Sequence, residues 1–346
     1  MLAAVFYAPN NIVVQQVPVS RRKVMLRVSA CAVCGYDARV FRNGHRKVRP
    51  PVILGHELCG EIQNDIMSGG GMTINAGSRV AVCPLIPCLQ CPYCKIGDYN
   101  LCINLREIGS TSDGGFAQYV TIPEQLIRMG GLVPVPDNLT DEEAALLEPL
   151  ACCLNSYSRM LPVAKETSVV IIGDGPMGLI HLQLFKRLSS SRVAIVGKVP
   201  LRMEKARAMG ADAVFAYSRE TVPDVLDFAG ASSFGAGVIV IATSNPVAFE
   251  LATKVAARNS KINVFAGMPS GQTFLLDANW LHYNQISITG TFSSTPKLLG
   301  EATRIAAEKM IDLSAFVTHK YSLPEIEEAI EVTEKYHGLR AVINKF

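Results

Sequence analysis

The segment 167–290 constrains the fold most strongly, because short apolar runs alternate in it with amphipathic segments. The apolar runs, which predict strands, are 169–172, 193–196, 214–216, 238–242, 262–265 and 286–288. Segments with helical periodicity lie between several of these runs, at 179–188, 201–209 and 246–257. Apolar strands that alternate with helices are typical of a parallel sheet covered on both faces, so we predict an α/β domain here.

A glycine-rich loop joins the first apolar run to the first helical segment. It has the pattern G-x-G-x-x-G and reads Gly173-Asp174-Gly175-Pro176-Met177-Gly178. Between a strand and a helix, these glycines permit a tight turn and let backbone N–H groups approach a pyrophosphate at the helix N-terminus. The pattern by itself is weak evidence, but at the start of an alternating region it predicts a dinucleotide-binding Rossmann domain.

The segments before and after this region have a different pattern of apolar residues. Residues 1–150 contain short apolar runs, such as 24–28 and 79–82, interrupted by Gly and Pro, which predicts an irregular β domain. The tail contains two helical segments, 300–310 and 324–336, and an apolar run at 341–343 that predicts a strand. The length of 346 residues also favours two domains over one.

Composition and charge argue against several classes of protein. The chain is 49% hydrophobic and 18% charged, which is typical of a globular enzyme rather than a disordered chain. With a net charge of +3 and no long basic tract interleaved with aromatic residues, we expect no nucleic-acid partner. The N-terminus lacks the features of a signal peptide, and no window approaches the roughly 18 apolar residues of a membrane span. We therefore expect a cytoplasmic protein without a membrane partner.

Four cysteines lie close together in the sequence with the spacing C-x2-C-x2-C-x7-C, at Cys88, Cys91, Cys94 and Cys102. In the reducing cytoplasm, clustered cysteines are better interpreted as metal ligands than as disulfides. Four thiolates can surround one Zn2+ tetrahedrally, and a site closed in this way leaves no position for a substrate, so its metal is structural. The alternative is a set of reduced, buried cysteines or a disulfide pair.

A second set of candidate metal ligands precedes this cluster. Cys34 lies in the segment 31–37, CAVCGYD, and His56 and Glu57 lie in a G-H-E sequence at 55–57. A thiolate, an imidazole and a carboxylate give three protein ligands or near-ligands and leave a fourth position for water or substrate. By itself this set is weak evidence, because a lone His beside a Glu is more often structural.

With these motifs in this order, the chain resembles the zinc-containing medium-chain dehydrogenases over essentially its full length. The family's C-x-x-C-G-x-D, G-H-E and four-cysteine motifs stand at 31–37, 55–57 and 88–102. Its D-G-G-F-A-x-Y and E-P-L motifs stand at 113–119 and 148–150. Residues 84–88 and 148–150 look like the sorbitol, threonine and galactitol-phosphate dehydrogenase branch.

The resemblance implies a GroES-like catalytic domain of residues 1–153 and 287–346, which holds two zinc sites, and a Rossmann domain of residues 154–286. The active site would lie in the cleft between them. Because relatives are dimers or tetramers, the resemblance also implies a homo-oligomer.

The resemblance further assigns roles to the second set of ligands. Cys34 and His56 would bind the catalytic zinc, and Glu57 would be a third ligand or lie next to one. Glu148 would face the metal through water or exchange with it. Alternatively, Glu148 is only a carboxylate at the start of a helix, beside Pro149.

The implied activity is hydride transfer between a secondary alcohol of a polyol and NAD(P), which gives a ketone or ketose. Zn2+ acts in such chemistry as a Lewis acid that lowers the pKa of the alcohol, and the nicotinamide takes the hydride. One alternative is an anionic substrate such as a polyol phosphate, a sugar acid or a threonine-like amino alcohol, attracted by the basic loop 42–49, RNGHRKVR. The alternative interpretation is that this loop is a solvated surface turn with no role in substrate binding. A second alternative is a non-catalytic NADP-binding relative.

Three positions depart from the family pattern. Tyr36 stands where this branch usually has a Ser or Thr that takes the substrate proton; it is a catalytic candidate, but its longer phenol need not reach the same place, so the proton-relay residue stays open. Asn155 stands where many relatives have a His. Ser293 stands where sorbitol dehydrogenases have an Arg, so sorbitol itself is not assured as the substrate. Together with Ser294, it suits a substrate with several hydroxyls.

The residues after the second strand of the Rossmann domain predict NADP(H) as the preferred cofactor, with NAD(H) possible. In this fold an acidic residue at the end of that strand hydrogen-bonds the ribose hydroxyls and repels a 2′-phosphate. Here Gly197 takes this position, and the following Lys198 and Arg202 could bind a phosphate through charge-assisted hydrogen bonds. If Lys198 is only solvated and Arg202 only starts a helix, both cofactors are used.

Overall fold

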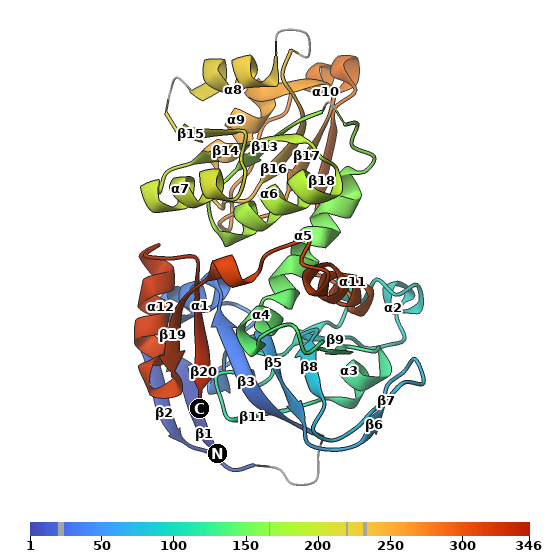
Figure 1. Cartoon of the computed structure of the whole chain (residues 1–346), viewed down its shortest axis with the longest axis vertical. Helices are drawn as coiled ribbons and strands as arrows, with labels where there is room; N and C mark the ends of the chain where they lie inside the picture. Colours follow the sequence, from blue (N-terminus) through green and yellow to red (C-terminus); the bar gives the residue numbers. More distant parts are fainter. Residues whose placement is uncertain (20–23, 166, 219–220, 231–233) are drawn as a thin grey trace. The chain divides into compact units, whose positions relative to one another are not determined.

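Six parallel strands form one sheet in the computed structural model, which describes residues 1–19, 24–165, 167–218, 221–230 and 234–346 (Figure 1). The strands are β13 (Ser168–Ile172), β14 (Arg192–Gly197), β15 (Ala213–Ala216), β16 (Ala236–Ile241), β17 (Ala256–Val264) and β18 (Ser287–Gly290). They lie in the order β15-β14-β13-β16-β17-β18, and each neighbouring pair is parallel. This order, in which the chain starts in the middle and winds outward in both directions, is that of the Rossmann fold. The prediction of a parallel α/β sheet is confirmed.

Helices cover both faces of this sheet. They are α6 (Pro176–Leu188), α7 (Pro200–Ala208), α8 (Thr221–Ala229), α9 (Val247–Val255) and α10 (Ala278–Asn284). On one face, Val170 and Ile172 of β13 belong to a buried apolar cluster that includes Phe228 of α8 and Phe249 of α9. On the other face α6 contacts β13 and β14 (Figure 1). Because each face is covered, all five residues of β13 are buried, which explains the apolar runs of the sequence.

The chain divides into two compact units, Met1–Ala151 with Ser293–Phe346, and Cys152–Phe292. The six-stranded sheet belongs to the second unit, and α5 (Leu147–Met160) runs from the first unit into the second. The sequence placed the second domain boundary after residue 286. In the structure this boundary falls after Phe292, because β18 pairs in parallel with β17 and so belongs to the six-stranded sheet.

The first unit contains a seven-stranded sheet with the order β12-β8-β5-β3-β20-β19, in which β11 also pairs with β3. Its strands are β3 (Met25–Val33), β5 (Glu57–Ile62), β8 (Arg79–Val82), β11 (Tyr119–Thr121), β12 (Leu132–Pro134), β19 (Val317–Ser322) and β20 (Arg340–Lys345). The last two come from the C-terminal tail, so the two ends of the chain build one sheet.

Smaller elements complete the first unit. The remaining strands are β1 (Leu2–Ala8), β2 (Asn11–Gln16), β4 (Val52–Ile53), β6 (Ile66–Met67), β7 (Thr73–Ile74), β9 (Leu85–Ile86) and β10 (Arg106–Glu107). The helices are α1 (Gly35–Asn43), α2 (Pro92–Lys95), α3 (Glu124–Arg128), α4 (Asp141–Ala145), α11 (Pro296–Ala307) and α12 (Ile326–Glu334), with short 3-10 turns at Tyr99–Leu101, Ser314–Phe316 and Leu323–Glu325. None of the helices in the described ranges is long and apolar enough to cross a membrane.

One helix of the tail begins earlier than the sequence pattern suggested. The sequence predicted a helix over 300–310, whereas α11 spans Pro296–Ala307. Thr295 accepts a hydrogen bond from the backbone N–H of Leu298 and so caps the first turn. Pro296 follows at the first helical position, where its missing N–H has no consequence.

The register of the seven-stranded sheet brings three distant segments to one end of it. Ala32 of β3 lies opposite Glu57, the first residue of β5. Val33, the last residue of β3, lies opposite Ala341 near the start of β20. The ends of these neighbouring strands therefore carry Cys34, the G-H-E sequence and Arg340 into the same region.

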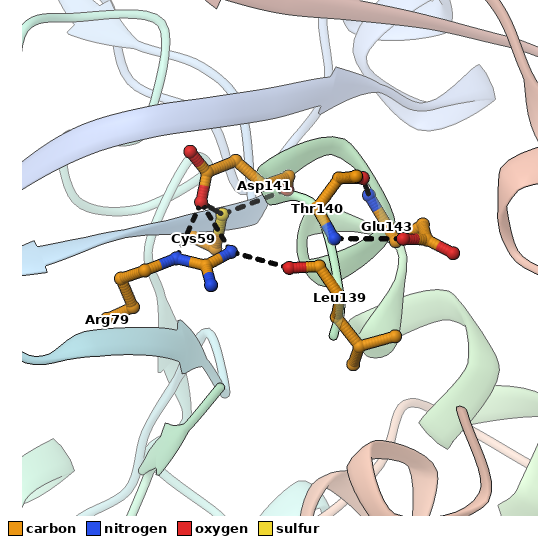
Figure 2. A network of polar contacts seen from close by, with 6 residues as sticks. All are labelled: Cys59, Arg79, Leu139, Thr140, Asp141 and Glu143. Atoms are coloured by element: carbon orange, nitrogen blue, oxygen red, sulfur yellow. Dashed lines mark hydrogen bonds and ion pairs between the residues drawn. The ribbon is translucent and has the colours of Figure 1, made fainter. Parts of the chain in front are cut away.

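A polar network holds the start of α4 against this sheet (Figure 2). The Arg79 guanidinium on β8 donates to Asp141 Oδ1 over 2.8 and 3.0 Å and to the Leu139 carbonyl over 2.8 Å. The Cys59 thiol on β5 donates to the backbone carbonyl of Asp141 over 3.0 Å. Since α4 leads into α5, this network fixes the segment that carries Glu148.

Candidate active site

Cys34 lies at the junction of β3 and α1, where it is the N-cap residue of the helix. Its backbone N–H donates to Asp37 Oδ2 over 2.9 Å, so the carboxylate satisfies a backbone donor of the strand-to-helix turn. The bond fixes the turn on which the Cys34 thiol stands.

The other Asp37 oxygen faces His56. Oδ1 lies 3.5 Å from His56 Nδ1, and the Asp37 side chain is fully buried. Burial opposes protonation of His56, but the Asp37 charge and hydrogen bonds with Asp37 and Cys34 raise its pKa well above the ordinary value in the metal-free chain. A carboxylate in this position orients an imidazole and makes it a better metal ligand.

Glu57 is a buried carboxylate, with 1% of its surface exposed. Its Oε1 accepts a hydrogen bond from Arg340 over 2.9 Å, and both side chains of this ion pair are buried. Burial raises the pKa of Glu57 to about 7, although Arg340 and His56 act in the opposite direction. Within the described part of the chain, Glu57 Oε2 is buried and has no hydrogen-bond partner. A buried carboxylate oxygen without a partner is costly unless a cation binds it.

The ligand atoms of Cys34, His56 and Glu57 all lie within 4.8 Å of one another. A thiolate, an imidazole and a carboxylate oxygen at such separations fit one Zn2+, whose ligand distances are about 2.0–2.3 Å. Glu148 is not part of this group in the described residues. It is buried on the first turn of α5, and its charge raises the pKa of Glu57, so it lies near the group.

Tyr36 stands beside these ligands. Its ring packs edge-on against the His56 ring, with 5.7 Å between the centroids. Its hydroxyl lies 2.9 Å from Ser110 Oγ and 3.3 Å from His45 Nδ1. Burial raises the pKa of the phenol. The hydroxyl thus connects to a chain of polar groups that ends at the exposed His45, which is the arrangement a proton relay needs.

The four cysteines of the second cluster also converge. Their sulfur atoms all lie within 4.8 Å of one another, and Cys91, Cys94 and Cys102 are buried. The Cys91 and Cys94 sulfurs are 3.5 Å apart. Four thiolates around Zn2+ stand roughly 3.8 Å apart, so the cluster fits a closed metal site.

The glycine loop of the second unit has the geometry of a phosphate-binding turn. Gly175 is the N-cap of α6, and Pro176 is in its first turn with Met177 after it. A Cβ at Gly178 would lie 2.0 Å from the Gly173 carbonyl oxygen, whereas at Gly175 the nearest atom to a Cβ would be 3.9 Å away. Close packing therefore requires Gly178, and the space at Gly175 leaves the helix N-terminus open to a pyrophosphate.

The three residues predicted to select the cofactor lie near this loop. Gly197 ends β14, and the Lys198 ammonium sits 4.9 Å from the centre of the Tyr217 ring. Arg202 is buried on α7, with its guanidinium 3.9 Å from the Cβ position of Gly175. Both cations thus belong to the corner between the glycine loop and the end of β14.

Comparisons with known proteins show the family of this chain. The family model described as the alcohol dehydrogenase GroES-like domain matches residues 20–137, and the model described as zinc-binding dehydrogenase matches residues 176–308. The sorbitol dehydrogenase of Bacillus subtilis strain 168 is 30% identical over 96% of this chain and 93% of that protein. The chain belongs to the zinc-containing medium-chain alcohol and polyol dehydrogenase family.

Two further relatives show the range of this dehydrogenase family. The D-arabitol-phosphate dehydrogenase of Enterococcus avium is 26% identical over 93% of this chain and 89% of that protein. A putative zinc-binding dehydrogenase from Sinorhizobium meliloti 1021, whose crystal structure contains NADP, superposes with a TM-score of 0.88 at 27% identity, over 99% of this chain and 98% of that one. The predictions of a GroES-like domain, a Rossmann domain and an oxidoreductase are confirmed.

Sequence reasoning missed two residues of the candidate site. Asp37 was noted only as part of a motif, although an acidic residue in the first turn of a helix that follows a candidate ligand was a usable signal. Arg340 carried no signal, because its partner Glu57 is 283 residues away in the sequence. The Asp37 charge acts on His56 and the Arg340 charge acts on Glu57, and both of these are candidate metal ligands.

Other positions that the sequence singled out are placed by the structure as follows. Asn155 is buried and donates to the Phe292 carbonyl over 3.3 Å. Ser294, which the sequence suggested for substrate hydroxyls, is buried. In the basic loop, Arg42 is bound to Glu334 and Asn10 over 2.7 and 2.9 Å. Its guanidinium is therefore engaged within the protein, whereas Arg46, Lys47 and Arg49 are exposed.

Proposed function

We propose that this dehydrogenase oxidises a secondary alcohol of a polyol, or reduces the corresponding ketose, with zinc and NAD(P). The observation that carries the proposal is the convergence of Cys34, His56 and Glu57, with their ligand atoms within 4.8 Å of one another. Glu57 Oε2, which is buried and has no hydrogen-bond partner among the described residues, supports the same site, because a cation would satisfy it.

Zn2+ held by Cys34, His56 and Glu57 would supply a Lewis acid that lowers the pKa of the substrate alcohol. The surrounding residues would position these ligands. Asp37 would orient His56, and Arg340 holds Oε1 of Glu57, while Oε2 has no hydrogen-bond partner among the described residues. Glu148 is near enough to act on Glu57 electrostatically and serves as a candidate exchangeable ligand.

Tyr36 is the candidate for proton removal. A proton taken from the substrate hydroxyl would pass along the contact between the Tyr36 hydroxyl and His45 Nδ1, and His45 is exposed to solvent. Ser110 Oγ, 2.9 Å from the same hydroxyl, would hold the phenol in place. The relay thus has a hydroxyl at one end and a solvated imidazole at the other.

A second Zn2+ bound by Cys88, Cys91, Cys94 and Cys102 would have a structural role, since four thiolates leave no open position. The dinucleotide would bind with its pyrophosphate at the glycine loop, where Gly175 leaves room, and nicotinamide accepts the hydride. Gly197, Lys198 and Arg202 support NADP(H) as the preferred cofactor.

The proposed substrate class is inferred from the substrates that the names of the relatives give. A sorbitol dehydrogenase and a D-arabitol-phosphate dehydrogenase both act, by name, on sugar alcohols or their phosphates. The exposed Arg46, Lys47 and Arg49 favour the phosphate or another anion as a second candidate. We further propose a homo-oligomer, which light scattering of the purified protein tests.

The test combines metal content with activity. In Cys34→Ser we expect a loss of about one zinc per chain and at least a 100-fold loss of activity, with the fold retained. Cys91→Ser is the matched thiol-to-hydroxyl change at the other cluster and should mainly lower stability. Fully active protein with less than one bound zinc would contradict the proposal, as would two zinc ions without any turnover on polyols, polyol phosphates or aldonates.

The same screen tests the substrate class. Catalytic efficiency should be higher for at least one polyol or polyol phosphate than for ethanol and benzyl alcohol, measured as absorbance of the reduced nicotinamide with both NAD+ and NADP+. A higher efficiency for the simple alcohols contradicts a polyol substrate. Phosphorylated substrates that are preferred only at low ionic strength would favour the anionic alternative.

A further inference from the structure

Asp174, the second residue of the glycine loop, directs its carboxylate to the end of β14. Its Oδ2 accepts hydrogen bonds from the backbone N–H groups of Lys198 and Val199, each over 2.7 Å. The Asp174 side chain is almost buried, with 8% of the residue exposed. Two short bonds to backbone donors fix the carboxylate in one place.

This place is the one that a side chain at position 197 would occupy. A Cβ built on Gly197 would lie 2.5 Å from Asp174 Oδ2, 2.6 Å from Asp174 Cβ and 2.7 Å from Asp174 Cγ. These distances are too short for a real Cβ atom, and the two backbone bonds prevent Asp174 from moving aside easily. Gly197 is thus the residue that makes room for the Asp174 carboxylate.

In dinucleotide-binding folds, the end of the second strand is where a carboxylate bonds the adenosine ribose and repels a 2′-phosphate. The sequence lacks an acidic residue there, and the structure supplies one from the glycine loop, 24 residues before Lys198. Among the described residues, Asp174 Oδ1 makes no hydrogen bond, so it remains available as an acceptor for a ribose hydroxyl.

Two basic side chains near Asp174 favour binding of a 2′-phosphate, which the Asp174 carboxylate opposes. The exposed Lys198 ammonium lies over the ring of Tyr217, and Arg202 lies beside Gly175. The sequence-based prediction of NADP(H) was based on these two cations and on the absence of an acidic residue at position 197. It did not count Asp174, whose charge opposes a 2′-phosphate at the same corner.

We propose that Asp174 is the carboxylate that discriminates against the 2′-phosphate in this enzyme, replacing the acidic residue that the strand end lacks. It thereby keeps NAD(H) in use despite Lys198 and Arg202. The inference rests on the proposed binding of a dinucleotide at the glycine loop. A carboxylate and a 2′-phosphate a few ångströms apart repel each other, so loss of the Asp174 charge shifts the binding ratio toward NADPH at least tenfold.

The decisive variant is Asp174→Asn, because the amide oxygen still accepts from the two backbone N–H groups while the charge is gone. Dissociation constants of NADH and NADPH are measured by nucleotide fluorescence on the full-length, zinc-loaded protein. The ratio of the NADH constant to the NADPH constant should rise at least tenfold in Asp174→Asn and in Asp174→Ala. A ratio within twofold of wild type in Asp174→Asn overturns the inference and leaves Asp174 as a clamp on the turn.

A swap of the two positions provides the second variant, should Asp174→Asn fail to fold. Gly197→Asp alone brings a Cβ onto the Asp174 carboxylate and should weaken binding of both nucleotides. Combined with Asp174→Gly, it moves the carboxylate to the strand end and should return the ratio to within about threefold of wild type. A double variant that still favours NADPH tenfold more than wild type contradicts the inference. If wild type binds neither nucleotide, the proposed function fails and the inference fails with it.

Discussion

Asp37 does two things at once in this enzyme. One carboxylate oxygen accepts from the Cys34 backbone, and the other lies 3.5 Å from His56 Nδ1. Because the side chain is fully buried, its charge acts on the imidazole with little screening by water. A single residue therefore holds the turn under one proposed metal ligand and lies beside another.

Replacing Asp37 by Asn separates these two roles. The amide oxygen can still accept from the Cys34 backbone, but the negative charge beside His56 is lost. We expect zinc affinity at the Cys34 site to fall about 10- to 100-fold, as for other outer partners of metal ligands. Competition with a chromophoric chelator measures this. The four-cysteine site is the internal control, and equal weakening of both sites would contradict the assigned role.

His181 on α6 is a buried histidine outside the metal site. Its Nδ1 is 2.7 Å from the Met177 carbonyl, and in the described structure the buried Nε2 has no hydrogen-bond partner. Burial lowers the pKa of His181 to about 4. Between pH 6.5 and 4 the unfolded chain therefore binds a proton that the folded chain does not, so the free energy of unfolding falls as the pH falls.

The His181→Leu variant should lack this pH dependence. Between pH 7.5 and pH 5 the wild type should lose about 2 kcal/mol more unfolding free energy than the variant, since one pKa unit corresponds to about 1.4 kcal/mol. Urea titrations at both pH values measure the difference, and carboxylates common to both proteins cancel. Identical losses in the two proteins would show that His181 is not buried in its neutral form.

At the scale of elements, the start of α4 depends on its cap. Thr140 Oγ1 accepts from the Glu143 backbone over 3.2 Å, and Glu143 Oε2 accepts from the Thr140 backbone over 2.9 Å. The neighbouring Asp141 is bound by Arg79 (Figure 2). This reciprocal arrangement is a capping box, which satisfies two backbone donors of the first turn.

Thr140→Ala removes one half of that box. We expect a loss of about 1 kcal/mol in the free energy of unfolding, within the range seen for N-cap residues. Thr140→Ser keeps an oxygen at the same position and should lose less than half as much. Chemical denaturation of the three proteins at one zinc concentration provides the measurement, and equal losses in the Ala and Ser variants would mean that the hydroxyl does not cap α4.

At the scale of the whole molecule, the proposed metal ligands and the glycine loop belong to different compact units. Cys34, His56 and Glu57 lie in the unit of residues 1–151 and 293–346, and Gly173 and Gly178 lie in the unit of residues 152–292. Each unit has its own sheet. Binding of the dinucleotide should therefore not require the catalytic metal.

Brief treatment with a zinc chelator tests this separation. Turnover should fall at least tenfold, and the dissociation constant of the reduced cofactor should stay within about twofold, because the backbone groups of the loop are unchanged. Zinc added back should restore turnover. An unchanged melting temperature shows that the structural site remains loaded. Parallel loss of turnover and cofactor affinity, at an unchanged melting temperature, would contradict independent sites.

Local patterns in the sequence determined much of this protein. The glycine loop, the cysteine spacing at 88–102 and the alternation of apolar runs each depend on residues a few positions apart, and such patterns persist in the fold because backbone geometry links near neighbours directly. They predicted the parallel sheet and the four-cysteine cluster, whereas the grouping of Cys34 with His56 and Glu57 followed from the resemblance to the dehydrogenase family.

The tertiary structure alone decided which charges face one another. Arg340 meets Glu57 across 283 residues because β20 pairs with β3 and β3 pairs with β5. Asp174 reaches the end of β14 because β13 and β14 are adjacent in the sheet. Electrostatic interactions depend on distance in space and on burial, and neither quantity can be read from separation along the chain.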